Sequence, residues 1–121
     1  MPRILLALLL ALAVAAPALA QTVIAVDINK AKLLWDAGVG GGVPTEYRVK
    51  CGTTTGVYSK TTLVAFPTRE VTVKAAIAGE GNWFCVVTAA NAIGESGPSN
   101  EVAFLAGTPP SVPVNLRLQA Q

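Results

Sequence analysis

Short stretches in which every second residue is apolar constrain this chain more than any other feature. Tyr47, Val49 and Cys51 alternate with two basic residues, and a longer alternation runs from Trp83 to Ala89. A two-residue period puts alternate side chains on opposite faces of a strand, and the mature chain shows no sustained helical period. Further alternations lie at residues 31–35, 71–74 and 102–104, and turn-rich segments lie at 38–44, 52–56, 78–82 and 92–99. The pattern predicts an antiparallel β-sandwich.

The first twenty residues have the pattern of a secretory signal peptide. Met1-Pro2-Arg3 is a short basic start, residues 4–16 are apolar, and Ala18-Leu19-Ala20 matches a signal-peptidase site. Cleavage before Gln21 would leave about a hundred residues, the size of one small domain. An uncleaved anchor is the alternative, but the apolar run is at the short end of the roughly 17–25 residues that span a bilayer, and Pro17 interrupts it. We expect a secreted protein, periplasmic or extracellular, without an integral membrane span after cleavage.

Composition argues against several functional classes. The formal net charge is +2 and the basic residues are scattered, so no nucleic-acid partner is expected. The chain has no histidine, the commonest general base and metal ligand at neutral pH. Asp27-Ile28-Asn29 starts like a calcium loop but lacks the glycine and the distal glutamate. The other acidic residues share no local segment, so we expect no enzyme, no cofactor and no metal site.

Two stretches, "LLWDAGVGGGVPTEYRVKCG" and "WFCVVTAANAIGESGPSNEV", resemble the fibronectin type III family, of the bacterial or phage secreted single-domain type. The resemblance covers residues 31–105. It implies an all-β, immunoglobulin-like fold of about seven antiparallel strands over residues 21–106. Trp35 would lie on strand B in the core, Tyr47 on strand C, and Trp83 at the start of strand F.

The chain departs from this family at the corner before strand F. The family places a tyrosine at the start of this strand and a leucine six residues earlier, where this chain has Trp83 and Ile77. An indole can only donate through its N–H, so the corner hydrogen bond would have to be rebuilt.

Cys51 and Cys85 would face inward from neighbouring strands C and F in the fibronectin-like arrangement. Their Cβ atoms could then approach within the distance of a disulfide, and secretion favours the bond. The alternatives are two buried thiols acting as small apolar side chains, or a reactive thiol without a histidine beside it.

Two loops have a composition that could form a binding site. In the connection between strands F and G, residues Ile93, Gly94, Glu95 and Ser96 are the best-placed surface for a contact, although turn chemistry also explains this segment. The glycine-rich segment 38–42 lacks the Gly-Lys-Ser/Thr of a phosphate loop and is expected to be a flexible connection.

The resulting functional expectation is a non-catalytic protein-binding or adhesion module of the cell envelope or of a virion, with an unknown protein partner. Carbohydrate binding is the alternative. Tyr58 and Phe66 flank an expected edge strand and could stack on sugars, although packing against the adjoining sheet also accounts for them.

The C-terminal tail, residues 107–121, begins as a proline-rich linker. It continues with Val114, Leu116 and Leu118 alternating with polar residues. The segment "PPSVPVNLRL" resembles the linker and first strand of a further repeat. The tail could therefore be disordered, or it could self-associate by adding a strand to a neighbouring molecule's sheet edge.

Overall fold

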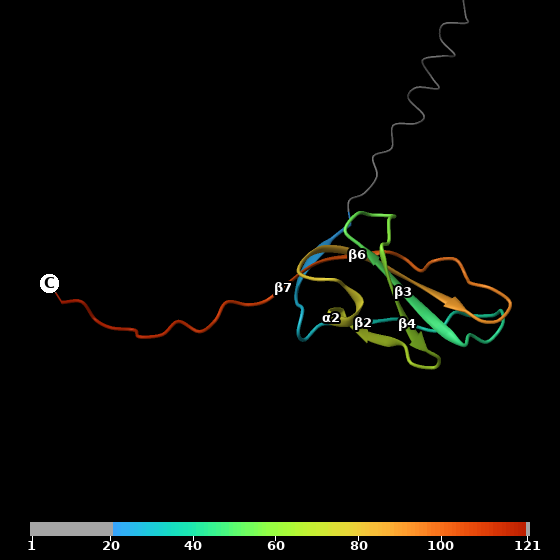
Figure 1. Cartoon of the computed structure of the whole chain (residues 1–121), viewed down its shortest axis with the longest axis horizontal. Helices are drawn as coiled ribbons and strands as arrows, with labels where there is room; N and C mark the ends of the chain where they lie inside the picture. The colour runs from blue at the N-terminus through green and yellow to red at the C-terminus, as the bar shows by residue number, and fades with distance from the viewer. Residues whose placement is uncertain (1–20, 121) are drawn as a thin grey trace, which may run out of the picture.

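A computed structural model describes residues 21–120, in which two β-sheets pack around a shared core (Figure 1). The expectation of an all-β fold is confirmed. The first sheet has the order β1-β7-β6-β3-β4 and the second pairs β2 with β5. The elements are β1 (Val23–Asp27), β2 (Lys32–Leu34), β3 (Glu46–Gly52), β4 (Lys60–Ala65), β5 (Glu70–Thr72), α2 (Val73–Ala76), β6 (Gly81–Ala90) and β7 (Val102–Gly107). The expected signal peptide lies outside the described residues. Within the described part, no helix is long and apolar enough to cross a membrane.

The prediction that all strands are antiparallel is wrong for the first strand. β1 pairs with β7 in a parallel register from Val23 opposite Ala103 to Asp27 opposite Gly107. The first sheet is therefore mixed, while its other pairs and the β2–β5 pair are antiparallel. An alternating sequence predicts which side chains share a face, but it carries no information on the direction of a neighbouring strand.

The core is built from the inward-facing residues of the central strands. Tyr47, Val49 and Cys51 of β3 are buried opposite the alternating residues of β6. Cys51 and Cys85 are direct cross-strand partners with their Cα atoms 4.2 Å apart, and their sulfur atoms form a disulfide. This bond links β3 covalently to β6. Disulfides are typical of proteins from oxidising compartments.

The corner before β6 is rebuilt around the tryptophan. The indole Nε1 of Trp83 donates a hydrogen bond of 2.8 Å to the carbonyl of Gly79. Trp83 and Ile77 are both buried in the core, Trp35 is partly buried against it, and Tyr47 is 3% exposed. The hydrogen bond fixes the turn from which the longest strand starts.

A single helical turn, α2, replaces part of the strand expected at residues 71–74. The Thr72 side chain caps it by accepting a hydrogen bond from the Ala75 amide. Val73 and Ala76 are both buried, so the turn contributes two apolar side chains to the core. A capping threonine before two small residues stabilises such a turn locally, and this outweighs the preference of valine for a strand.

The tail after β7 extends away from the two sheets (Figure 1). Residues 108–120 contain no strand, and their side chains are exposed. The strand-like pattern of this segment therefore has no partner within its own domain.

Candidate functional site

The loops at one end of the molecule line an open cavity of about 690 Å³. One loop, residues 35–45, connects β2 to β3, and the other, residues 91–101, connects β6 to β7. Both contribute to the cavity wall. We call this end of the molecule the loop pole.

Three aromatic side chains are part of the cavity wall. Trp35 and Tyr47 meet edge to face with ring centroids 5.4 Å apart, and Phe66 lies 6.2 Å from Tyr47. The Tyr47 hydroxyl and the Trp35 Nε1 are buried, and neither has a hydrogen-bond partner among the described residues. Buried polar groups are nearly always paired, so these two donors are costly for the fold as it stands.

The turn at residues 91–94 is closed by one asparagine. The Asn91 Oδ1 accepts hydrogen bonds from the amides of Ile93, at 2.9 Å, and Gly94, at 3.3 Å. The Asn91 amide donates to the Gly94 carbonyl at 3.0 Å. In addition, Asn91 Nδ2 donates to the Val43 carbonyl at 3.2 Å, which ties this turn to the other loop of the pole. The tip of the turn is thus held in one conformation.

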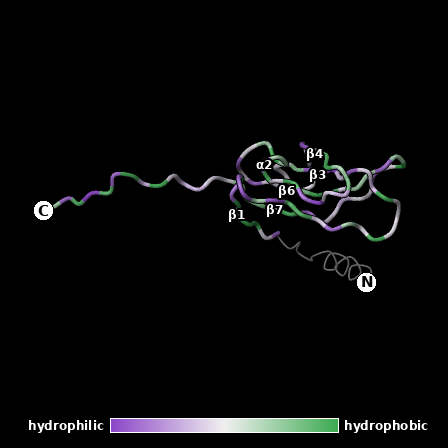
Figure 2. Tube along the Cα trace, turned by 90° about the horizontal axis from the view of Figure 1, so that it is seen from below, coloured by the Kyte–Doolittle hydropathy of each residue, from purple (hydrophilic) through white to green (hydrophobic). Residues whose placement is uncertain are grey.

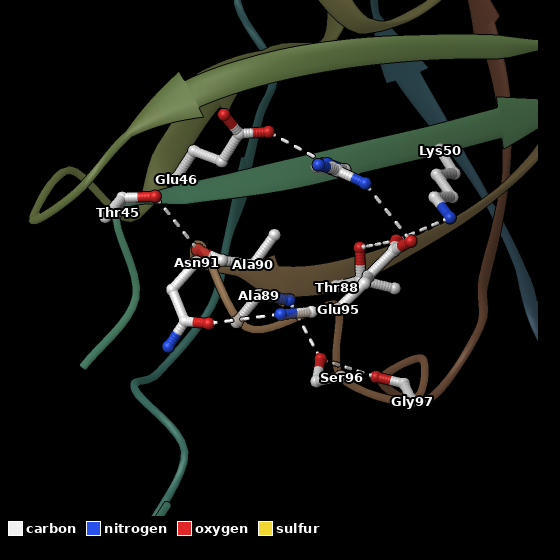
Figure 3. Close-up of polar contacts among 12 residues, drawn as sticks. Thr45, Glu46, Lys50, Thr88, Ala89, Ala90, Asn91, Glu95, Ser96 and Gly97 are labelled. Atoms are coloured by element: carbon white, nitrogen blue, oxygen red, sulfur yellow. Dashed lines mark hydrogen bonds and ion pairs between the residues drawn. The ribbon is translucent and has the colours of Figure 1, made fainter. Parts of the chain in front are cut away.

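Glu95 fastens the same turn to the outer face of the sheet (Figure 3). Its carboxylate accepts from Lys50 Nζ at 2.6 Å, from the Thr88 hydroxyl at 2.5 Å and from Arg48 at 3.2 Å. The Lys50 and Thr88 hydrogen bonds are the main cause of a Glu95 pKa lowered to about 2. Arg48 is also paired with Glu46, at 2.8 Å, which raises the pKa of its guanidinium. Glu95 was predicted as a contact residue, but its carboxylate already has three partners within the domain.

Two serines of the loop between β6 and β7 then pair with the part of β6 that β7 does not reach. The Ser96 amide donates to the Ala89 carbonyl, and the Ala89 amide donates back to the Ser96 hydroxyl oxygen (Figure 3). Ser99 makes the same exchange with Val87. β7 pairs with β6 only as far as Cys85, so these serines satisfy the backbone groups that it leaves open.

All four predicted contact residues are exposed, and Ile93 is the one with a large apolar side chain. Its side chain is 95% exposed at the tip of the braced turn. Gly94 is part of the turn, while Glu95 and Ser96 hold it in place. Asn91 was not among the predicted contact residues, although an asparagine two residues before a turn tip is a recognisable signal for this local hydrogen bonding.

The other loop of the pole adds further apolar surface. Val39 is fully exposed and Val43 is 70% exposed. Gly40 and Gly41 have φ angles of +81° and +73°, a region in which other residues are strained. The glycines therefore allow the loop to pass over the cavity, and no helix follows it that could form a phosphate site.

The two aromatic residues considered for sugar binding lie at opposite ends of β4. Tyr58 precedes the strand and Phe66 follows it, so they cannot stack on one sugar. Phe66 packs against Tyr47. The Tyr58 hydroxyl donates to Glu101, and burial followed by this bond raises the Tyr58 pKa.

Glu101, like Glu95, is a carboxylate that holds a loop in place, and it was not predicted from the sequence. Besides Tyr58, its carboxylate accepts from the Thr55 hydroxyl at 2.6 Å and from the Gly56 amide at 3.1 Å. The Thr55 and Tyr58 hydrogen bonds lower the Glu101 pKa to about 2. The carboxylate thereby holds the loop between β3 and β4 against the start of β7.

Within residues 21–120, no group of three or more potential metal ligands lies close enough to hold a metal ion. No family model, curated protein or solved structure matches this chain.

Proposed function

We propose that this chain is a secreted, non-catalytic protein-binding or adhesion module of fibronectin type III type. In this proposal it acts at a cell envelope or on a virion, and the loop pole is its contact surface. The observation that carries the proposal is Ile93, a large apolar side chain that is 95% exposed on a turn closed by hydrogen bonds.

The bracing of this turn argues for recognition. A loop that is already ordered loses little conformational entropy when it binds, so more of the contact energy remains as affinity. Asn91 closes the turn, and Glu95 anchors it to β3 and β6. Val39 and Val43 extend the apolar surface beyond Ile93. Exposed apolar patches of this kind are typical of protein interaction sites.

The cavity beside the turn suggests how a partner engages. Its wall includes the aromatic residues Trp35, Tyr47 and Phe66, so it fits an apolar side chain of a partner. Sugar recognition is less well supported, because Tyr58 and Phe66 lie at opposite ends of β4.

The test compares Ile93→Asp with the wild-type protein in capture experiments on solubilised cell envelopes of the source organism or its host. The control is Leu105→Asp, which places the same charge on an exposed leucine of β7, opposite Asn82 at the end of β6 that is remote from the loop pole. A central apolar contact contributes about 2 kcal/mol or more, so Ile93→Asp should weaken capture of the partner about 30-fold. Leu105→Asp should have no effect.

A glycan array separates the two classes of partner. A protein captured by the wild type but not by Ile93→Asp, with no glycan signal, supports the proposal. Specific glycan binding that Ile93→Asp leaves unchanged would contradict it.

A further inference from the structure

The two sheets differ in width, and the larger sheet is not covered over its first strand. Ile24 and Val26 of β1 stand in register with Phe104 and Ala106 of β7, whose side chains are buried in the core. Residues in register share a face of the sheet, so Ile24 and Val26 point toward the inner side. Ile24 is nevertheless 62% exposed. The inner face of β1 is therefore uncovered at Ile24, while Val26 is partly buried against the core.

β2 borders this uncovered face. The turn at residues 28–31 leads directly from β1 to β2, whereas α2, which follows β5, contacts β3 and β4 on the other side of the molecule. β2 has β5 as its only partner strand among the described residues. Its free edge thus faces the side of the sandwich on which β1 is exposed.

The free edge of β2 presents unpaired backbone groups. The Trp35 amide donates to Arg69, and the Ala31 carbonyl accepts from Val73, so the odd-numbered residues face β5. Backbone groups alternate in direction along a strand, so the amides and carbonyls of Lys32 and Leu34 face the free edge. We call the space between this edge and the inner face of β1 the β2 slot. It offers hydrogen-bonding groups on one side and apolar side chains, Ile24 and Val26, on the other.

The C-terminal tail has the complementary pattern. Four apolar residues occur at every second position and are almost completely exposed, namely Val112, Val114, Leu116 and Leu118. Figure 2 shows hydrophobic and hydrophilic residues alternating along this tail. Such a segment can bury one face against apolar side chains while its backbone pairs with a strand edge. Asn115 has a φ of 58°, so pairing along the whole segment includes extension of the backbone at this residue.

We infer that residues 112–118 of one copy of this protein enter the β2 slot of a second copy and form a third strand beside β2. The second copy, and not the same molecule, is the recipient because Pro109, Pro110 and Pro113 stiffen the tail, and it leads away from its own domain (Figure 1). The alternating leucines and valines would cover Ile24 and Val26. This contact uses a sheet edge and does not depend on the function proposed for the loop pole.

The donor side is tested by sedimentation of the protein expressed from residues 1–121 in a host with an oxidising secretory route. Leu116→Asp places a carboxylate on the apolar face of the tail, and Gln119→Asp places the same charge on its other face. The mass of the wild type should rise with concentration to a dimer or a longer assembly. Leu116→Asp and deletion of residues 109–121 should weaken this association at least tenfold, and Gln119→Asp should leave it unchanged.

The recipient side is tested at Leu34. Leu34→Pro removes an amide that faces the free edge and breaks no hydrogen bond to β5, and proline is tolerated on strand edges. It should abolish association, whereas Leu34→Ala should retain it. Independently of whether the proline variant folds, a synthetic peptide of residues 109–121 should slow hydrogen exchange of the Lys32 and Leu34 amides in Leu116→Asp protein.

Three results would overturn the inference. The first is a wild-type protein that stays monomeric at all concentrations. This includes a monomer whose own tail slows hydrogen exchange of the Lys32 amide. The second is an association that Leu116→Asp leaves unchanged. The third is a tail peptide that protects the edge of β1 or β4 but not that of β2.

Discussion

Trp83 occupies a position where its ring is buried in the core and its N–H reaches back to the preceding turn. The hydrogen bond to Gly79 ties the start of β6 to that turn. We predict that Trp83→Phe lowers the free energy of unfolding by about 1–3 kcal/mol, because it removes both the donor and part of the packed ring. Urea unfolding under non-reducing conditions measures this change.

Trp83→Tyr is the matched comparison, because its hydroxyl restores a donor on a ring of nearly the same size as phenylalanine. It should be more stable than Trp83→Phe. Equal stability of the two variants would show that the hydrogen bond to Gly79 contributes nothing.

At the residue scale, the sequence was sufficient for a few core positions. It placed Cys51 and Cys85 on neighbouring strands with a disulfide as one of the alternatives, and the structure joins them. It also placed Trp83 at the start of the strand that is β6. By contrast, the partners of Glu95 could not be predicted. Lys50 and Thr88 lie on two different strands, and their approach to Glu95 depends on how the connection after β6 folds back over the sheet.

The acid response of the protein follows from Glu95 and Glu101. Hydrogen bonds from Lys50 and Thr88, and from Thr55 and Tyr58, lower the two pKa values from 4.5 to about 2. Between these pH values the unfolded state binds more protons than the folded state, so stability decreases as the pH falls. We predict a nearly constant urea midpoint from pH 7 to 5 and a decline from about pH 4.5 to 2.

Glu95→Gln should make this decline shallower, because one of the two titrating carboxylates is removed. An unchanged decline in Glu95→Gln, or a decline that is complete above pH 5, would contradict the assignment.

At the scale of the elements, the connection after β6 behaves as a substitute strand. Ser96 and Ser99 exchange hydrogen bonds with Ala89 and Val87, where β7 no longer pairs. We predict that Ser99→Ala speeds hydrogen exchange of the Val87 amide about fivefold, as expected for the loss of about 1 kcal/mol. Ser111→Ala, in the exposed tail, is the control. If Val87 exchanges at the same rate in Ser99→Ala, the serine does not protect the edge of β6.

Elements with a long alternation were predicted well, and short ones less so. The patterns at residues 47–51 and 83–89 correspond to β3 and β6. The alternation at residues 71–74 falls partly in β5 and partly in α2. Thr72 can cap a helix, and Val73 can be buried in either a strand or a helix. Short apolar patterns are ambiguous between strand and helix for this reason.

At the scale of the whole molecule, the sequence predicted two packed layers but not how the first strand joins them. The pairing of β1 with β7 leaves a two-stranded sheet opposite a five-stranded one. The loop pole also depends on tertiary structure, because Asn91 hydrogen-bonds to Val43, which lies 48 residues earlier in the chain. Neither contact has a local signal in the sequence.

Amide hydrogen exchange of the protein, alone and with its captured partner, tests most directly whether the loop pole is the binding surface. In the free protein the Ile93 and Gly94 amides should exchange slowly, because Asn91 accepts their hydrogen bonds. On binding, protection should increase at residues 91–94 and 39–43. Unchanged exchange at the loop pole, with protection confined to β4 or to the tail, would contradict the account.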